Sequence, residues 1–296
     1  MNSPCPYCQH PSFLLFRAQD YNRQIGNDLF TYFCCNNCRL LFLDPVPDNL
    51  NPYYPKDYYY LPQTLEELSI NAEHENYKIE IVKSFLKSGK ILEIGPGGCG
   101  FAYLAKKEGF EIETLEMDSR VAAFLNNVVK IPTYNASDSS AIPQKQQYNM
   151  IALWHVIEHV REPFKMLKEI SKLLLPGGFI LIAAPNPNAW QFKIFKHLWT
   201  HVDAPRHLFL IPQDLLSHFM TDLAFKTLLS TTTDEGGLGW NSFGWQRSLS
   251  NHMKSRLGKI TTSMVGKIAS AFTKPIEKKE GTGSCYTMVF QKTDNP

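Results

Sequence analysis

The sequence carries almost no excess charge of either sign, with a formal net charge of +2 over 296 residues. This balance gives no overall electrostatic case for nucleic-acid binding. Apolar runs are short, as at Met150 to Leu153, whereas a membrane span needs about 20 apolar residues. Residues 1–10 contain neither a basic nor an apolar segment, so we expect no secretory signal and a reducing, cytoplasmic location.

Cysteines are few, and in a reducing compartment they are not expected to form disulfides. Four of the seven occur as two CxxC pairs, Cys5 with Cys8 and Cys35 with Cys38, separated by 26 residues. Paired thiolates at this spacing predict a tetrahedral Cys₄ site, with Zn²⁺ as the default ion and iron as an alternative. A redox-active CxxC is the rival interpretation, but no thioredoxin-like βαβ unit accompanies it.

The chain lacks internal repeats and low-complexity tracts but divides by composition. Residues 1–45 contain both CxxC pairs and predict a small unit with short strands. Residues 46–63 are rich in proline and tyrosine and predict an extended linker. Residues 64–235 together with 285–296 form the predicted main domain, and 236–284 an insertion or lid.

Within the main domain, predicted strands and helices alternate. Such alternation predicts a Rossmann-like α/β fold with a parallel sheet covered by helices on both faces. Seven strands are expected, and the helices begin near Thr64, where Thr64 and Glu67 form a capping box. The predicted strands are 90–94, 111–116, 129–134, 149–154, 179–184, 224–232 and 285–292; the other predicted helices are 101–108, 119–126, 163–175 and 213–222.

Four glycines fall within six positions at one turn, Gly95-Pro96-Gly97-Gly98-Cys99-Gly100, between the first strand and its helix. Glycine there lets the backbone approach a ligand at the positive end of a helix. The spacing is not the dinucleotide pattern GxGxxG. Glu93 closes the strand before the turn, and Glu116 closes the next strand, where a carboxylate can accept the hydroxyls of a ribose. A tight turn without a ligand is the alternative.

With these motifs the sequence resembles class I S-adenosylmethionine-dependent methyltransferases, over roughly residues 60 to 235 and the last strand. The resemblance rests on four segments in order: "ILEIGPGGCGF", "TLEMD", "YNMIALWHVIEHV" and "LLLPGGFILIAAPN". It implies a seven-stranded methyltransferase sheet with S-adenosylmethionine as cofactor. The residues it implies at the cofactor are Glu93 in the first motif, Gly95 and Gly97 at the methionine part, Glu116 at the ribose, Ser137 and Asp138 near the adenine, and Trp154 and His155 between cofactor and acceptor.

The segment "LWTHVDAPRHLFLIP" follows the fifth strand and should lie over the carboxyl edge of the sheet. His207 is the candidate general base or orienting residue, with Asp203 beside it and His159 as a further candidate. Sugar C-methyltransferases carry an Asp-Glu-His-like element at a similar place. Here Arg206 precedes the histidine, which disfavours carbon deprotonation, leaves O-methylation open and offers a partner for a phosphorylated substrate. A polar loop that only supports the fifth strand is the alternative.

The first 60 residues also resemble the zinc ribbon that precedes some bacterial methyltransferases acting on nucleotide-linked sugars or polysaccharide intermediates. We therefore expect methyl transfer to a sugar, glycan or related small molecule. Some zinc-ribbon methyltransferases modify RNA instead, but residues 1–45 contain only Arg17, Arg23 and Arg39 as cations. A binding module without catalysis is the second alternative, against which the intact acid and glycine motifs argue.

One basic segment, residues 246–280, has eight Lys or Arg against two Glu. Leu249, Met253, Ile260 and Ile268 fall near helical spacing, which predicts a basic amphipathic helix. Such a helix can lie on the surface of an anionic membrane. A lid helix packed on the domain with a solvated basic face explains the pattern equally well.

Overall fold

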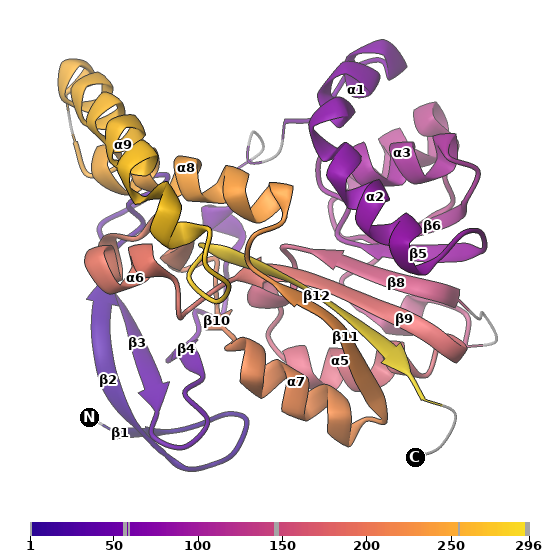
Figure 1. Cartoon of the computed structure of the whole chain (residues 1–296), viewed down its shortest axis with the longest axis horizontal. Helices are drawn as coiled ribbons and strands as arrows, with labels where there is room; N and C mark the ends of the chain where they lie inside the picture. Colours follow the sequence, from indigo (N-terminus) through magenta and orange to yellow (C-terminus); the bar gives the residue numbers. More distant parts are fainter. Residues whose placement is uncertain (1, 56–57, 59, 145–147, 254, 294–296) are drawn as a thin grey trace.

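The computed structural model describes residues 2–55, 58, 60–144, 148–253 and 255–293 and contains a seven-stranded mixed sheet (Figure 1). Its order is β11-β12-β9-β8-β5-β6-β7, and only β12 runs antiparallel to its neighbours. The α/β fold and the alternation predicted from the sequence are confirmed. The strands are β5 (Lys90–Ile94), β6 (Glu111–Glu116), β7 (Thr133–Asn135), β8 (Tyr148–Trp154), β9 (Leu174–Pro185), β11 (Phe225–Thr231) and β12 (Cys285–Lys292).

Helices cover both faces of this sheet because the side chains of a strand alternate between two faces. In β8, Met150 and Ala152 join one hydrophobic cluster, while Ile151 and Leu153 join the other. The first cluster is covered by α1 (Leu65–Ala72), α2 (Asn76–Phe85), α3 (Gly100–Lys107) and α4 (Ser119–Phe124). The second is covered by α5 (Pro163–Ser171) and α7 (Gln213–Asp222).

Most element boundaries lie close to those expected. Thr64 is the N-cap of α1 and accepts a hydrogen bond from the Glu67 backbone, as the capping box predicts. Two strands differ from the expected bounds. The strand expected at 129–134 covers only Thr133–Asn135, because residues 125–129 continue the preceding helix, and β9 begins at Leu174 rather than at 179. Leu174 already pairs with Tyr148, so the expected helix 163–175 ends at Ser171. The next pair is Met150 with Phe179, which means that the Pro-Gly-Gly segment forms an irregularity within β9.

The second sheet has the order β1-β2-β3-β4-β10 and contains both CxxC segments. Its strands are β1 (Asn2–Pro4), β2 (Pro11–Ala18), β3 (Phe30–Cys35), β4 (Leu41–Leu43) and β10 (Phe209–Leu210). The expected boundary at residue 45 therefore needs correction for this sheet. β10 comes from the main domain and pairs Phe209 with Phe42, which covers the otherwise open edge of β4.

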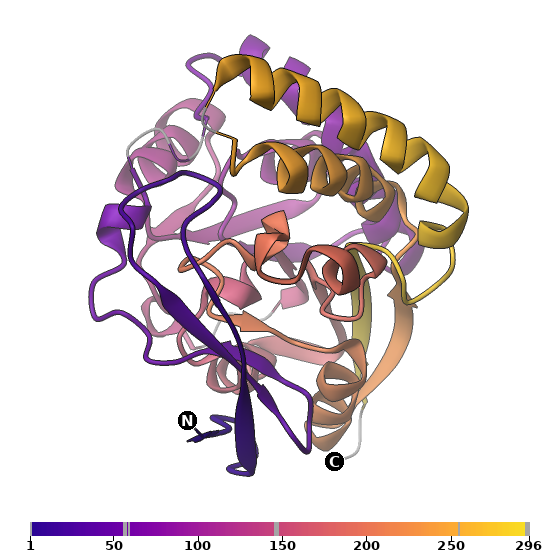
Figure 2. The same ribbon diagram turned by 90° about the vertical axis from the view of Figure 1, so that its left-hand side faces the viewer.

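The insertion at 236–284 forms an antiparallel pair of helices, α8 (Glu235–Ser250) and α9 (Arg256–Glu277), which lie side by side (Figure 2). The single amphipathic helix expected across 246–280 is wrong: the chain turns after Ser250, and Ser255 caps a new helix. The helices approach closely at Gly266, where an added Cβ would lie 2.7 Å from the Gln246 Cα. In the described part of the chain, no helix is both long and apolar enough to cross a membrane.

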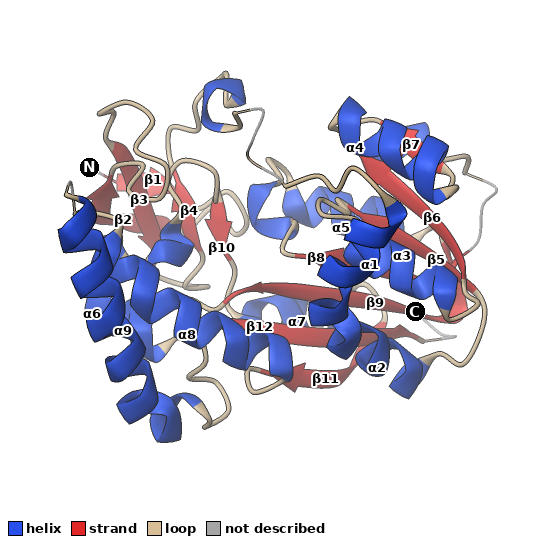
Figure 3. Ribbon diagram, turned by 90° about the horizontal axis from the view of Figure 1, so that it is seen from above, coloured by secondary structure: helices blue, strands red, loops and turns tan. Residues whose placement is uncertain are grey.

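The small sheet and the α8–α9 pair lie beside the same end of the large sheet (Figure 3). This is the end where β8 and β9 finish. Between β9 and β10 the chain forms α6 (Trp190–Phe195) and short 3₁₀ turns, in the segment 186–211 expected to be irregular. The carboxyl edge of the sheet, where α/β folds bind their ligands, is thus enclosed by residues distant in sequence.

Candidate active site

A cavity of about 1630 Å³ lies at the carboxyl ends of β5, β6 and β8. One wall consists of the glycine turn and the ends of these strands. The opposite wall comes from the loop at Asn22 and Arg23, the linker after residue 48, and α8 through Trp240, Phe243 and Arg247. Every residue that the sequence predicts at the cofactor lines this one cavity, as do His159, Asp203 and His207. Their individual roles stay predictions.

The glycine turn needs glycine at position 95 for two reasons. Gly95 has φ +67°, and an added Cβ would lie 2.7 Å from Cγ2 of Val156. Gly97 also has a positive φ, of +47°, whereas Gly98 faces open space. Cys99 takes the left-handed conformation at the N-cap of α3, so the turn keeps its path with a small side chain in place of a glycine.

Glu116 is held rigidly at the end of β6. Its Oε1 accepts a hydrogen bond from the Asp118 N–H at 2.7 Å, and its Oε2 lies 3.4 Å from the Gly97 nitrogen. Burial raises the pKa of this carboxyl, and the backbone N–H groups of Asp118 and Gly97 act in the opposite direction. Because the side chain lines the cavity while it is 4% exposed, its remaining lone pairs can face a ligand such as the hydroxyls of a ribose.

Glu93 lies deeper, 2% exposed at the end of β5. Burial raises its pKa to about 8, helped by the negative charges of Glu75 and Glu116 and opposed by Lys78. Its Oε2 has no hydrogen-bond partner among the described residues. A buried, unpartnered carboxyl oxygen beside an open glycine turn fits a ligand that brings its own hydrogen-bond donor or positive charge, as the amino acid end of S-adenosylmethionine does.

The other predicted cofactor residues lie along the same wall. Asp138 follows β7 and accepts a hydrogen bond from the Ser140 N–H. The side chain of Ser140, followed by this N–H group, lowers the pKa of Asp138. Trp154 ends β8 and packs against Phe101 with 5.6 Å between ring centroids. His155 follows in a left-handed conformation that turns the chain toward α8, where its ring lies 5.0 Å from that of Trp240.

On the other side of the cavity, Glu158, His159 and His207 place one ligand atom each within 4.8 Å of one another. Nδ1 of His207 lies 2.8 Å from the His201 carbonyl, and Nδ1 of His159 lies 3.0 Å from the Arg206 carbonyl. A carbonyl can only accept a hydrogen bond, so we assign the proton of each ring to Nδ1 and the lone pair to Nε2. Nε2 of His207 lies 4.0 Å from Oε1 of the buried Glu158.

Glu158 is the member of this group that the sequence did not single out. It is 1% exposed, and neither of its oxygens has a hydrogen-bond partner among the described residues. Burial raises its pKa, but His155, His207 and His159 outweigh this and hold the pKa at about 2. Its position directly before His159 in "IEHV" was visible, but an acid in a helical turn is usually solvated. Only the packing of three separate segments buries it.

Arg206 has a different role from the one expected. It is fully buried, and its guanidinium pairs with both Asp20 and Asp203, at 2.5 and 2.7 Å. Among its bonds, Nε also donates to Asp203 at 2.9 Å and Nη1 to the Tyr53 carbonyl at 3.2 Å. The expected contact of Arg206 with a substrate phosphate is therefore wrong, because its donors are directed at carboxylates of the protein itself. Nothing in the sequence near Asp20 points to this pairing.

His159 and Asp203 are constrained by the same network. Burial, followed by the charge of His207, lowers the pKa of His159 to about 4, and its Nδ1 also lies 3.0 Å from the Tyr54 hydroxyl. Asp203 accepts from Arg206 and Asn22, and its Oδ2 is 4.0 Å from Nε2 of His207. Both side chains are therefore placed to orient His207 and its surroundings.

The four cysteines converge as their spacing predicts. Neighbouring sulfurs are 3.6 Å apart for Cys5 and Cys38, 3.5 Å for Cys8 and Cys35, and 3.6 Å for Cys8 and Cys38. The four sulfur atoms all lie within 4.8 Å of one another, and two backbone N–H groups point at the Cys35 sulfur. Four thiolates about 2.3 Å from one ion would be about 3.8 Å apart, so this arrangement fits a tetrahedral ion.

The sheet order and the glycine turn with its two acids define a class I S-adenosylmethionine-dependent methyltransferase domain. A family model described as "Methyltransferase domain" matches residues 70–230, which is more than half of the chain. The chain belongs to this family and therefore contains an S-adenosylmethionine-dependent methyltransferase domain.

Several known proteins are similar to the chain. Among curated proteins, the ubiquinone biosynthesis O-methyltransferase of Aliivibrio fischeri is 24% identical over 155 residues, which cover 50% of this chain and 64% of that protein. A putative sarcosine dimethylglycine methyltransferase from Galdieria sulphuraria is similar in structure, with a TM-score of 0.51, 17% identity and coverage of 76% and 86%. A SAM-dependent methyltransferase from Archaeoglobus fulgidus also has a TM-score of 0.51, at 16% identity and coverage of 75% and 94%. These structural likenesses concern the fold alone.

Proposed function

We propose that the enzyme transfers a methyl group from S-adenosylmethionine to a hydroxyl of a sugar, glycan or related small molecule. The observation that carries this proposal is the group formed by His207 and Glu158 in the cavity that also contains the glycine turn. A hydroxyl must lose its proton during transfer, so a placed base is useful. The curated relative named above is an O-methyltransferase, and the chain matches 64% of its length.

His207 is the proposed base. S-adenosylmethionine supplies an activated methyl group, so the protein's task is to orient the acceptor and to receive one proton. Nε2 of His207 takes the proton from the acceptor hydroxyl as the oxygen attacks the methyl carbon. The imidazolium that forms lies 4.0 Å from Oε1 of Glu158, which is ionised at neutral pH because its pKa is about 2. His159, with a pKa of about 4, is a weak base and is assigned a positioning role.

The test is single-turnover methyl transfer by His207→Ala at saturating cofactor and acceptor, with the acceptor found by labelled-methyl profiling of nucleotide-sugar and lipid-linked glycan pools. Loss of a general base is expected to slow transfer roughly 10²–10⁴-fold while cofactor affinity stays unchanged. His218→Ala, on an exposed face of α7, is the matched control and should behave like wild type. A rate for His207→Ala within about threefold of wild type removes His207 from the mechanism.

A second role for the same group has its own support. Two imidazoles with Nδ1 directed to backbone carbonyls and one buried carboxylate resemble the ligands of a divalent cation. Such a cation would bind the acceptor oxygen and lower the pKa of its hydroxyl. Dialysis against a chelator followed by Mg²⁺ or Mn²⁺ tests this, because these hard ions do not refill a thiolate site. Turnover that is unchanged by chelation excludes the cation.

We further propose that Cys5, Cys8, Cys35 and Cys38 hold one structural Zn²⁺. The support is the convergence of their sulfurs and their position in a sheet that borders the cavity. Reduced protein is expected to contain about one equivalent of zinc by elemental analysis. Cys8→Ser should lose it, whereas Cys34→Ser should not, since the Cys34 sulfur contacts the carbonyls of Cys35 and Arg39 instead. Full zinc retention in a Cys5→Ser, Cys35→Ser double variant contradicts the assignment.

RNA is the alternative acceptor. Salt-dependent binding of RNA with measurable specificity would favour it over a small molecule. Absence of RNA binding together with methyl transfer to a glycan fraction would favour the proposal above.

A further inference from the structure

The outer face of α9 exposes a continuous apolar surface, which we call the α9 stripe. Its residues are Leu257, Ile260, Met264, Val265, Ile268 and Phe272, and Phe272 is 81% exposed. At 100° per residue these positions span about 140° of the helix surface. Gly266, which contacts α8, lies on the opposite side. A run of large apolar side chains without cover over four turns of one helix marks a binding surface.

The helix that carries the α9 stripe has several basic side chains and no exposed acidic one within residues 256–279. Residues 256–279 contain six Lys or Arg and a single acid, Glu277. Glu277 is buried and accepts hydrogen bonds from Gln191 and Trp245, so its charge does not face the same surface. Arg256, Lys267 and Lys274 fall within about 20° of one another on the helix and form one border of the stripe. An apolar face with a cationic border complements an anionic lipid surface.

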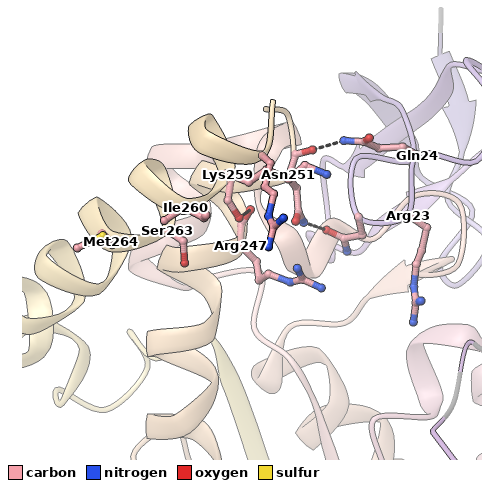
Figure 4. A pocket seen from close by; sticks show the side chains of 11 residues that line it. Arg23, Gln24, Arg247, Asn251, Lys259, Ile260, Ser263 and Met264 are labelled. Carbon is pink, nitrogen blue, oxygen red and sulfur yellow. Dashed lines mark hydrogen bonds between the residues drawn. The ribbon is translucent and has the colours of Figure 1, made fainter. Parts of the chain in front are cut away.

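A cavity of about 450 Å³ opens at the start of α9, between α8, α9 and the loop at residues 22–24 (Figure 4). Four cations line it: Arg23, Arg247, Arg256 and Lys259. The other lining residues are amides, hydroxyls and the stripe residues Ile260 and Met264; no carboxylate is among them. Within the described ranges, no ion pair involves these four cations. The cavity is therefore a cationic recess that is continuous with the apolar stripe.

The walls of this recess are ordered by contacts between the loop and the helices. The Gln24 side chain donates to the Asn251 carbonyl, and the Asn251 side chain donates to Asn22 at 2.5 Å (Figure 4). Arg23 is held by a hydrogen bond to the Tyr58 carbonyl. Arg23 and Arg247 line both this recess and the large cavity. A phosphate in the recess would therefore lie next to the cavity in which we propose that methyl transfer occurs.

We infer that α9 is a docking helix for the surface of an anionic phospholipid bilayer. The α9 stripe enters the boundary between headgroups and acyl chains, and the recess receives a lipid phosphate through Arg256 and Lys259. A second copy of this chain fits the surface less well. Two copies packed through the stripe would bring the cationic borders toward each other without intervening carboxylates, and like charges repel.

The experiment measures partition of the full chain onto extruded vesicles by co-sedimentation. Vesicles of phosphatidylcholine alone are compared with vesicles that also contain phosphatidylglycerol, at low and at raised salt. Binding is expected to the phosphatidylglycerol vesicles and to weaken as salt increases. Ile268→Glu should reduce partition at least tenfold. The matched control is Ile70→Glu on α1, because the two isoleucines are 58% and 60% exposed.

The recess is tested separately with the Arg256→Gln, Lys259→Gln double variant. Each cation is expected to increase partition onto an anionic surface about fivefold. Partition of the double variant onto phosphatidylglycerol vesicles should therefore fall on the order of twentyfold. Lys107→Gln with Lys226→Gln makes the same change of charge on other faces and should bind like wild type. A loss that is equal on both kinds of vesicle would overturn the role of the recess in phosphate binding.

Two outcomes overturn the docking helix itself. One is wild-type protein that does not sediment with phosphatidylglycerol vesicles at low salt. The other is a dimer in sedimentation velocity that Ile268→Glu dissociates, because the stripe would then be covered by a second copy. Methyl transfer enters none of these measurements, so their result is independent of the proposed acceptor.

Discussion

The two halves of the large cavity are built on different principles. The cofactor half, around Gly95, Gly97 and Glu116, uses backbone turns and carboxylates that directly follow strands of one sheet. The acceptor half, around Glu158 and His207, is assembled from several separate segments, with an arginine buried between two aspartates beneath it. The first half depends on local geometry, and the second depends on packing.

Substitutions in the two halves should therefore differ in their effects on cofactor binding and on the stability of the fold. In the cofactor half, substitutions at Gly97 and Glu116 are expected to alter a contact with the ligand and to change stability little. In the acceptor half, the groups that position His207 also join the small sheet to the main domain, so a substitution there affects folding as well. Four predictions test this distinction, and they are given in order of decreasing effect.

Gly97→Val is expected to abolish binding of S-adenosylmethionine. A β-branched side chain at φ +47° is strained and would project where the cofactor's methionine part is expected. Isothermal calorimetry measures the affinity. Gly109→Val is the matched control, since Gly109 also has a positive φ, of +87°, but lies outside the cavity. If both variants bind the cofactor equally well, the glycine turn is not the binding site.

Arg206→Ala is expected to lower the free energy of unfolding by about 3–5 kcal/mol, because it leaves the buried carboxylates of Asp20 and Asp203 without a partner. Urea unfolding measures the change. Lys165→Ala removes an ion pair with Glu162 that is exposed on both sides, and should cost less than about 1 kcal/mol. Similar losses in the two variants would contradict a structural role for the buried arginine.

Glu116→Ala is expected to weaken cofactor binding about ten- to a hundredfold, because a hydrogen bond to a charged group is worth roughly 1.5–3 kcal/mol. Stability should change little in comparison with Arg206→Ala. Glu111→Ala, at the other end of β6, is the control and should leave affinity unaltered. Unchanged calorimetric affinity in Glu116→Ala would remove this residue from the site.

The stabilities of the two halves should respond to pH in opposite senses. In the acceptor half, burial and the charges of His207 and His155 lower the pKa of His201 to about 3, from an ordinary 6.5. Between about pH 3 and pH 6.5, His201 therefore carries a proton in the unfolded chain but not in the folded chain. The stability that the neutral histidine contributes is complete above about pH 6.5 and falls as the pH decreases below it.

In the cofactor half, the pKa of Glu93 is raised from 4.5 to about 8. The folded chain keeps this proton over that range while the unfolded chain loses it, so the contribution of Glu93 is complete below about pH 4.5 and is lost as the pH rises toward 8. Thermal unfolding across pH 4 to 8 measures both slopes. His201→Gln should flatten the acidic side and Glu93→Gln the basic side; no change in either slope would contradict the assignment of these groups.

The local features of this protein could be predicted from its sequence. The alternation of strands and helices, the capping box at Thr64, the glycine turn with Glu93 and Glu116, and the two CxxC pairs all follow from residues close together in the chain. Their physical causes, strand and helix periodicity, backbone freedom at glycine and the spacing of thiolate ligands, act over short distances. The family resemblance rested on the same segments.

Which charges are buried together depends on how distant segments pack in the folded chain. Arg206 reads as a free cation in the sequence, yet Asp20, far away in the chain, neutralises it. Glu158 reads as a solvated acid, yet it becomes a buried partner of His207. The segment at 246–280 reads as one helix but folds as two, with the apolar side of α9 left exposed. Burial and pairing depend on segments that meet only in the folded chain, and no local pattern encodes them.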